Sequence, residues 1–165
     1  MIRRVRPEDA EELAALYRSN REFLEPFEPL RRPAFFTADG QRKRLEQQLA
    51  EETHPFAIVD GDAIAGAINL FGIVRGGLQS GVIGYWVDQA RNGHGLATGA
   101  VAEMLAYAFD ELELHRIEAA TLVENAPSQR VLEKNGFERI GLARSYLRIN
   151  GEWRDFILFQ RLGGD

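Results

Sequence analysis

Apolar residues follow two spacings along this chain, and each change of spacing marks a boundary between expected elements. Short apolar runs between turn residues predict strands, whereas apolar positions repeated every three or four residues predict amphipathic helices. The strongest helical pattern runs from Leu96 to Leu112, and we expect its apolar face to be core. Strands are expected over residues 2–6, 54–59, 63–73, 82–87, 116–123, 137–147 and 153–162.

Capping residues place the remaining helices. Pro7 and the acidic residues after it predict the start of a helix, and Thr37 is an expected N-cap for a helix that ends near Glu52. A short helix is expected over residues 20–27, and prolines interrupt regular structure from there to Phe36. The last helix covers residues 127–135 and stops at Gly136.

Two dipeptides predict tight hairpins. Asp60-Gly61 separates two expected strands, and Asn150-Gly151 joins the last two strands in a pattern typical of a type I′ turn. The resulting order is β-α-α-α-β-β-β-α-β-α-β-β, without internal repeats or an interior linker. This order predicts an α/β (α+β) fold in one domain, residues 1–165, with a mixed sheet and helices on both faces.

Composition narrows the functional classes. The 165 residues suit one core, and the net charge of −5 argues against a dedicated nucleic-acid binder, although basic residues gather in the first third. The chain has no cysteine, which excludes disulfides, thiolate nucleophiles and cysteine zinc sites. No apolar run is long enough to span a membrane, so we expect a cytoplasmic protein with neither membrane nor metal as partner.

The segment from Arg91 to Thr98 is the most informative part of the chain. It is a glycine-rich turn between an apolar strand and the helix that begins near Leu96. Such a turn exposes backbone N–H groups and the positive end of a helix dipole, which together bind phosphate groups. Its spacing differs from the G-x-G-x-x-G dinucleotide fingerprint, and the Gly-Lys-Ser/Thr of a Walker loop is absent.

This segment resembles motif A of the GCN5-related N-acetyltransferases (GNAT), Q/R-x-x-G-x-G/A. Gly95 and Ala97 match the motif, whereas Asn92 stands at the Gln or Arg position. Downstream, residues 124–137 are similar to the N-x-x-S…E-K-x-G-F element of the same family. Two such elements in this order are a specific joint signal. They imply a mostly antiparallel sheet of about seven strands, with a cleft for acetyl-CoA where two strands splay apart.

Further segments resemble one branch of that family, the ribosomal-protein alanine N-acetyltransferases (RimJ/RimL type). These segments are residues 20–29 on the substrate side, residues 74–76, and the tail from Tyr146 to Asp155, which matches Y-L-x-I-x-G-x-W-R-D. The resemblance covers nearly the whole chain. It implies acetyl transfer from acetyl-CoA directly to a primary amine, foremost a protein N-terminus.

The resemblance also implies which residues contact the cofactor. The pyrophosphate is expected on the backbone of residues 92–98, and the pantetheine amides are expected to pair with the strand 82–87 as an added strand would. The candidate cofactor-binding residues are Tyr85, Trp86, Val87, Arg91, Asn92, Gly93, His94, Gly95, Leu96, Ala97, Thr98, Asn125 and Ser128.

Three residues are candidates for catalysis. By resemblance Asn125 and Ser128 face the cofactor, with Ser128 near the sulfur as a proton donor, although both also suit ordinary helix capping. Tyr146 belongs to the tail that resembles the substrate side. The family's usual strand glutamate is replaced by Val82, so the general base is open among Glu118, Tyr146, Asp155 and water. An N-terminal amine with a pKa near 8 needs only a weak base.

Two alternatives to a protein N-terminus stay open. One is a small-molecule amine such as a polyamine, an amino acid or an antibiotic, for which the acidic residues Glu22, Glu25 and Glu28 could serve. The other is an acyl-CoA-binding module without catalysis, which only the substitution at Val82 favours. A homodimer is also open, because Trp153 and Phe156 suit either a core or a dimer face.

Overall fold

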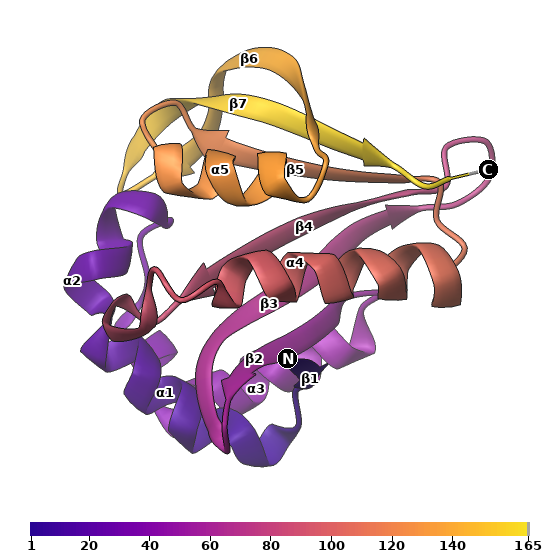
Figure 1. Cartoon of the computed structure of the whole chain (residues 1–165). Coiled ribbons are helices and arrows are strands. Elements are labelled where there is room, and N and C mark those ends of the chain that lie inside the picture. Colours follow the sequence, from indigo (N-terminus) through magenta and orange to yellow (C-terminus); the bar gives the residue numbers. More distant parts are fainter. Residues whose placement is uncertain (165) are drawn as a thin grey trace.

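One seven-stranded sheet forms the centre of the computed structural model, which describes residues 1–164 (Figure 1). The strand order is β1-β2-β3-β4-β5-β7-β6, and only the β4–β5 pair is parallel. The strands are β1 (Ile2–Arg4), β2 (His54–Asp60), β3 (Ala63–Val74), β4 (Ser80–Val87), β5 (Arg116–Leu122), β6 (Glu138–Ile149) and β7 (Glu152–Leu162). The predicted mixed, mostly antiparallel sheet is confirmed.

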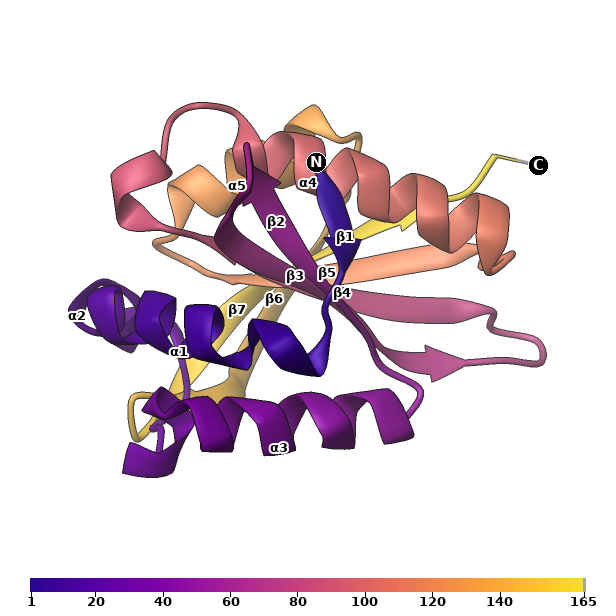
Figure 2. The ribbon, with the colours of Figure 1, turned by 90° about the horizontal axis from the view of Figure 1, so that it is seen from below.

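Helices cover both faces of this sheet, as expected. Figure 2 shows α1 and α3 on one side and α4 and α5 on the other. The α-helices are α1 (Ala10–Ser19), α2 (Arg21–Leu24), α3 (Ala38–Ala50), α4 (Leu96–Ala106) and α5 (Ala126–Lys134). Short 3-10 turns are η1 (Pro7–Asp9), η2 (Glu25–Phe27), η3 (Pro33–Phe36) and η4 (Gln89–Arg91). Within residues 1–164, no helix combines the length and the hydropathy that a bilayer crossing requires.

The main core lies between the sheet and α4. Val101 and Met104 of α4 are fully buried against Leu70, Ile117 and Phe159 of the sheet, which confirms the expected core face of this helix. A second cluster joins α1 and α3 to the other face. Apolar burial on both faces therefore fixes the sheet and places the β4–α4 turn at its edge.

Local turn chemistry behaves as the sequence predicts. Thr37 caps α3 by accepting a hydrogen bond from the N–H of Gly40 at 3.0 Å. Asn150 and Gly151 both have positive φ, at 46° and 86°, as a type I′ turn requires. Gly136 ends the last helix with a φ of 74°.

Several element boundaries differ from the prediction by one or two residues, and two of the differences have a visible cause in the structure. β1 ends at Arg4, because the N–H of Arg6 donates to the carboxylate of Asp9 at 2.8 Å and the chain turns into η1. The expected helix to Leu112 widens after α4 into a π-helical turn, η5 (Tyr107–Glu111). The hydroxyl of Tyr107 bonds the ring of His54 at 2.8 Å, a contact between distant elements that apolar spacing does not reveal.

The parallel pair β4–β5 opens the sheet. Its pairing covers only residues 80–82 of β4 with residues 116–118 of β5. Beyond Val82, β4 continues to pair with β3 as far as Val87, but it has no pairing with β5 within the described residues. The predicted splay is therefore present, and it leaves one edge of β4 available to a ligand.

Candidate active site

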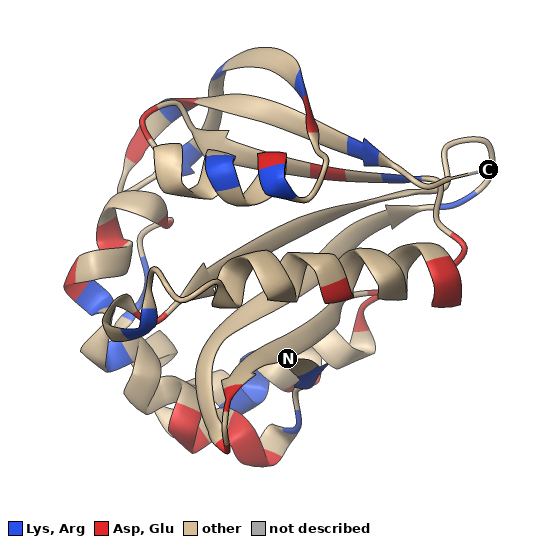
Figure 3. Ribbon diagram, in the orientation of Figure 1, with Lys and Arg blue, Asp and Glu red and all other residues tan. Residues whose placement is uncertain are grey.

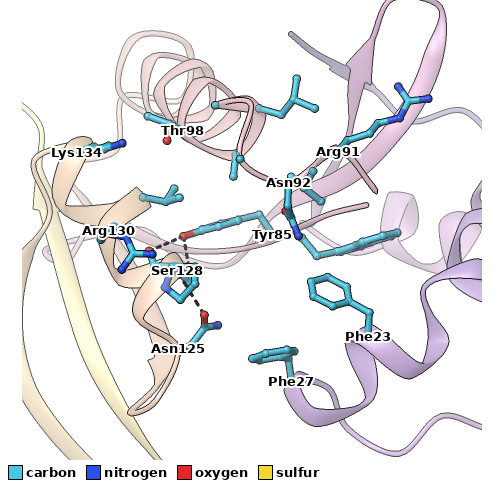
Figure 4. Close-up of a pocket in the computed structure, with 18 of the residues that line it drawn as sticks. Phe23, Phe27, Tyr85, Arg91, Asn92, Thr98, Asn125, Ser128, Arg130 and Lys134 are labelled. Atoms are coloured by element: carbon cyan, nitrogen blue, oxygen red, sulfur yellow. Dashed lines mark hydrogen bonds between the residues drawn. The ribbon is translucent and has the colours of Figure 1, made fainter. Parts of the chain in front are cut away.

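A cleft of about 460 Å³ lies beside the splayed part of β4, between α4 and α5 on one side and α2 on the other (Figure 4). All of the predicted cofactor-binding residues line it except His94. It is lined by Phe23, Leu24, Phe27, Tyr85, Trp86, Val87, Arg91, Asn92, Gly93, Gly95, Leu96, Ala97, Thr98, Asn125, Pro127, Ser128, Arg130, Val131 and Lys134.

The N-terminus of α4 forms an anion socket at one end of this cleft. Gly95 is the N-cap at a φ of 80°, and Gly93 has a φ of 82°, conformations that glycine adopts without strain. The first intrahelical bond is from the N–H of Gly99 to the carbonyl of Gly95, at 3.0 Å. The three N–H groups of residues 96–98 therefore precede the helical ladder, and no side chain among residues 1–164 caps them.

Two basic side chains that the sequence interpretation missed complete this socket. Arg130 and Lys134 lie on one face of α5, four residues apart, and both line the cleft (Figure 4). Figure 3 shows these charges on α5 beside the uncharged first turns of α4. Their i, i+4 spacing indicates that both side chains share one face of α5. Only the packing of α5 beside α4 shows that this face lies near the N-terminus of α4.

Arg91 and His94 differ from the other residues of the turn. The guanidinium of Arg91 pairs with Asp60 at 3.0 Å and with Asp88 at 3.7 Å, and it points away from Ser128 in Figure 4. His94 is exposed and its Nδ1 lies 3.2 Å from the carbonyl of Arg91. A contact of either side chain with a phosphate stays a prediction, whereas the backbone of the turn lines the cleft.

The side chain of Tyr85 connects β4 to α5 across the cleft. Its hydroxyl lies 2.8 Å from the hydroxyl of Ser128 and donates to the carbonyl of Ser128 at 3.2 Å. Burial raises the pKa of Tyr85 to about 12, despite the opposing hydrogen bond from Ser128. Tyr85 therefore keeps its proton at neutral pH and can hold the Ser128 hydroxyl in place.

Asn125 is the N-cap of α5. Its side-chain oxygen accepts a hydrogen bond from the N–H of Ser128 at 3.3 Å, so the expected capping role is confirmed. Both Asn125 and Ser128 also line the cleft. Their catalytic role stays a prediction that this position permits.

Trp86 points to the opposite face of the sheet from Tyr85, as the two-residue period of a strand requires. Its indole N–H donates to the hydroxyl of Tyr17 at 3.1 Å, and the two rings pack with centroids 4.7 Å apart. Phe23, Leu24 and Phe27 line the cleft on this side. The family resemblance places residues 20–29 on the substrate side, but the sequence alone does not single out these side chains.

The candidate general bases lie in other settings. Glu118 pairs with Arg116 at 2.7 Å, and Asp155 accepts from the N–H of Ser145 at 2.8 Å. Tyr146 is outside the residues that line the cleft, and its ring packs on Phe156 with centroids 5.8 Å apart. No aspartate or glutamate among residues 1–164 lines the cleft, so a base role for any of these groups stays a prediction.

Comparison with known proteins identifies the family. The model of the acetyltransferase (GNAT) domain matches residues 1–138, and the chain belongs to this family. The chain is 42% identical to the probable N-acetyltransferase YjcK of Bacillus subtilis, covering 99% of this chain and 94% of that protein. It is an N-acetyltransferase that uses acetyl-CoA, the donor that this family shares.

Two further relatives are similar over nearly the whole chain. The [ribosomal protein uS5]-alanine N-acetyltransferase of Escherichia coli is 34% identical, over 96% of this chain and 84% of that protein. The structure of RimJ from Mycobacterium smegmatis in complex with a CoA disulfide superposes with a TM-score of 0.94. It is 33% identical and covers 98% of this chain and 81% of that one.

The residues of the cleft fit coenzyme A. A Cβ atom at Gly93 or Gly95 would meet no atom within 4 Å, so the backbone there faces open space that a phosphate can enter. The three N–H groups of α4, together with Arg130 and Lys134, suit a pyrophosphate, and the free edge of β4 suits the amides of pantetheine. The thioester of the bound donor supplies the activated acetyl group.

Proposed function

We propose that this enzyme transfers the acetyl group to the N-terminal amine of a protein, of the ribosomal-protein alanine type. The relatives named above that carry this activity match nearly the full length of the chain. The observation that carries the proposal is the charge of the cleft. Its lining contains Arg91, Arg130 and Lys134 but no carboxylate among residues 1–164.

A cleft without carboxylates disfavours an acceptor that carries several positive charges. A polyamine or an aminoglycoside would bring several positive charges into a cleft whose lining has no carboxylate among residues 1–164 to offset their desolvation. Glu22 and Glu25 are exposed and do not line the cleft. Glu28 lines a separate pocket of about 70 Å³ and lies 3.5 Å from Arg31, so its charge is partly offset there.

The residues of the site then have distinct tasks. The N–H groups at the start of α4 bind the pyrophosphate, and the edge of β4 orients the pantetheine so that an N–H near Val87 faces the thioester oxygen. Ser128, held by Tyr85, passes a proton to the departing thiolate and regains one from water, and Asn125 holds the first turn of α5 in position. Tyr146 stays a candidate for the acceptor side.

The acceptor's own chemistry lowers the demand for a base. An N-terminal amine has a pKa near 8 and is partly neutral at pH 7, whereas a lysine side chain has a pKa near 10.4. Without a carboxylate in the cleft, water at its open mouth takes the proton. The enzyme is therefore expected to prefer N-terminal amines to lysine side chains, and a ribosomal-protein acceptor would place the reaction in the cytoplasm.

The test is a panel of amines with acetyl-CoA, read by release of the CoA thiol. The panel contains Ala- and Ser-initiated peptides, the same peptides with blocked N-termini, a peptide whose only amine is a lysine side chain, and spermidine. Turnover of the free Ala and Ser peptides alone supports the proposal. Preferential turnover of spermidine contradicts it, and tight binding of acetyl-CoA without turnover of any amine identifies a binding module.

A further inference from the structure

An aromatic wall of two phenylalanines faces the catalytic candidates across the cleft. Phe23 of α2 and Phe27 of η2 have ring centroids 6.1 Å apart and form this aromatic wall. Both rings point into the cleft, toward the side where α5 carries Asn125 and Ser128 (Figure 4). Phe27 is 39% exposed, which leaves an apolar surface of the cleft open to water.

Hydrogen bonds hold the N-terminal end of the aromatic wall to the turn that precedes the anion socket. Asn20, which is only 2% exposed, precedes α2 directly. Its side-chain oxygen accepts from the N–H of Gln89 at 2.9 Å, and its amide donates to Asp88 at 3.1 Å. Asp88 and Gln89 begin the turn that leads into the anion socket, so the hydrogen bonds of the buried Asn20 side chain fix the distance between the wall and the socket.

The second end of the aromatic wall is held by the turn between β6 and β7. The N–H of Asn150, in the β6–β7 turn, donates to the carbonyl of Glu28 at 2.8 Å. Glu28 follows Phe27 directly in the chain. The wall is therefore held at both ends, and such a prearranged apolar surface binds a ligand without a large ordering cost.

We propose that Phe23 and Phe27 form the subsite for the first residue of the acceptor and select an uncharged side chain there. This inference rests on the proposed function. The phosphate-binding groups lie on α4 and α5, opposite the wall, so the wall is left to the acceptor. A charged first side chain would lose water against two rings that offer no hydrogen bond, whereas a small apolar side chain would cover exposed ring surface.

Truncation of each ring tests the subsite. The variants are Phe23→Ala and Phe27→Ala, with Phe27→Leu as the conservative variant that keeps an apolar surface. Leu30→Ala is the matched control, because Leu30 is 68% exposed on the same segment and does not line the cleft. Each protein is assayed with acetyl-CoA and peptides that begin with Ala, Ser, Lys or Asp, and its affinity for CoA is measured by calorimetry.

The inference predicts a specific pattern. Each Phe→Ala variant raises the KM for the Ala-initiated peptide by roughly 10-fold and narrows the preference for Ala over Lys and Asp. The Kd for CoA changes less than 2-fold, Phe27→Leu recovers most of the loss, and Leu30→Ala behaves as the wild type. Thermal unfolding of each variant identifies any loss that comes from misfolding.

Three results would overturn the inference. If the Phe→Ala variants raised the Kd for CoA as much as the KM for the peptide, the aromatic wall would be assigned to the pantetheine. Unchanged peptide kinetics in both Phe→Ala variants would make the wall a surface without a ligand, while the proposed function stands. A wild-type enzyme that turns over none of the peptides would refute the proposed function and this subsite together, before any variant is compared.

Discussion

The hydroxyl of Tyr85 lies 2.8 Å from the hydroxyl of Ser128, and this pair joins the splayed strand β4 to the first turn of α5. Tyr85 is largely buried, which raises its pKa to about 12. The pair is therefore expected to affect the stability of the protein at high pH and the rate of acetyl transfer at neutral pH, and each effect can be measured separately.

The raised pKa of Tyr85 predicts a loss of stability in alkali. The folded state holds this proton up to about pH 12, whereas the unfolded chain releases it near 10, so the stabilisation is complete below pH 10 and is lost as the pH rises through 12. Between about pH 8 and about pH 11, the free energy of unfolding should fall by about 1 kcal/mol more in the wild type than in Tyr85→Phe. Urea titrations of both proteins measure this difference, and parallel pH profiles would contradict the assignment.

Removal of the Ser128 hydroxyl should slow the chemical step. If Ser128 supplies the proton to the thiolate, Ser128→Ala lowers kcat by about 100-fold while the Kd for CoA stays nearly constant. Tyr85→Phe should have a smaller effect, because it releases the Ser128 hydroxyl without removing it. Steady-state kinetics with the Ala-initiated peptide separates the two variants, and a kcat of Ser128→Ala close to that of the wild type would assign the proton to water.

Two variants of Asn125 should separate its capping of α5 from a role in catalysis. Asn125→Ala removes the cap of α5 and should lower the free energy of unfolding by about 1 kcal/mol. Asn125→Asp keeps a capping oxygen but replaces the amide N–H₂ group of a residue that lines the cleft. We expect its thermal stability to match the wild type while kcat/KM falls by roughly 10-fold. A fully active Asn125→Asp would limit Asn125 to capping.

Local backbone signals explain what the sequence predicted well. The glycines at 93 and 95 must adopt positive φ to uncover the helix N-terminus, and Asn125 precedes a helix that starts with Ala126-Pro127. Each of these patterns involves only a few neighbouring residues, so the anion socket and the cap of α5 could be located without knowledge of the fold. The same holds for Thr37 and for the turn at Asn150.

Contacts between distant segments explain what the sequence did not predict. Arg91 is paired with Asp60, thirty-one residues earlier, and Asn20 bonds Asp88, sixty-eight residues later. Nothing in either local pattern specifies these partners. The position of the aromatic wall depends on the second contact, so the place of Phe23 in the cleft could not be inferred from its neighbours in the chain.

The basic pair on α5 should contribute to the binding of coenzyme A through its charge. Arg130→Ala and Lys134→Ala are each expected to raise the Kd for CoA by roughly 3- to 10-fold at low salt, with a smaller effect at high salt because ions screen exposed charges. Calorimetry at two salt concentrations measures this, and dephospho-CoA shows whether the 3′-phosphate is the partner. Arg139→Ala on β6, exposed and outside the cleft, should leave the Kd unchanged. Equal effects of all three variants would indicate only a general loss of positive charge.

The close approach of β3 to β4 should make Gly66 the most sensitive glycine near the site. A Cβ at Gly66 would lie 2.2 Å from the carbonyl oxygen of Trp86 and 2.9 Å from the Cα of Val87, both rigid backbone atoms. Gly66→Ala must therefore push β4 away and is expected to cost about 3 kcal/mol in the free energy of unfolding. Gly77→Ala is the control, because a Cβ there meets no atom within 4 Å and should change stability by less than about 0.5 kcal/mol. Since residues 85–87 of β4 line the cleft, Gly66→Ala should also weaken the binding of acetyl-CoA in the fraction that folds. Equal stability of the two glycine variants in chemical denaturation would show that β3 yields instead of β4.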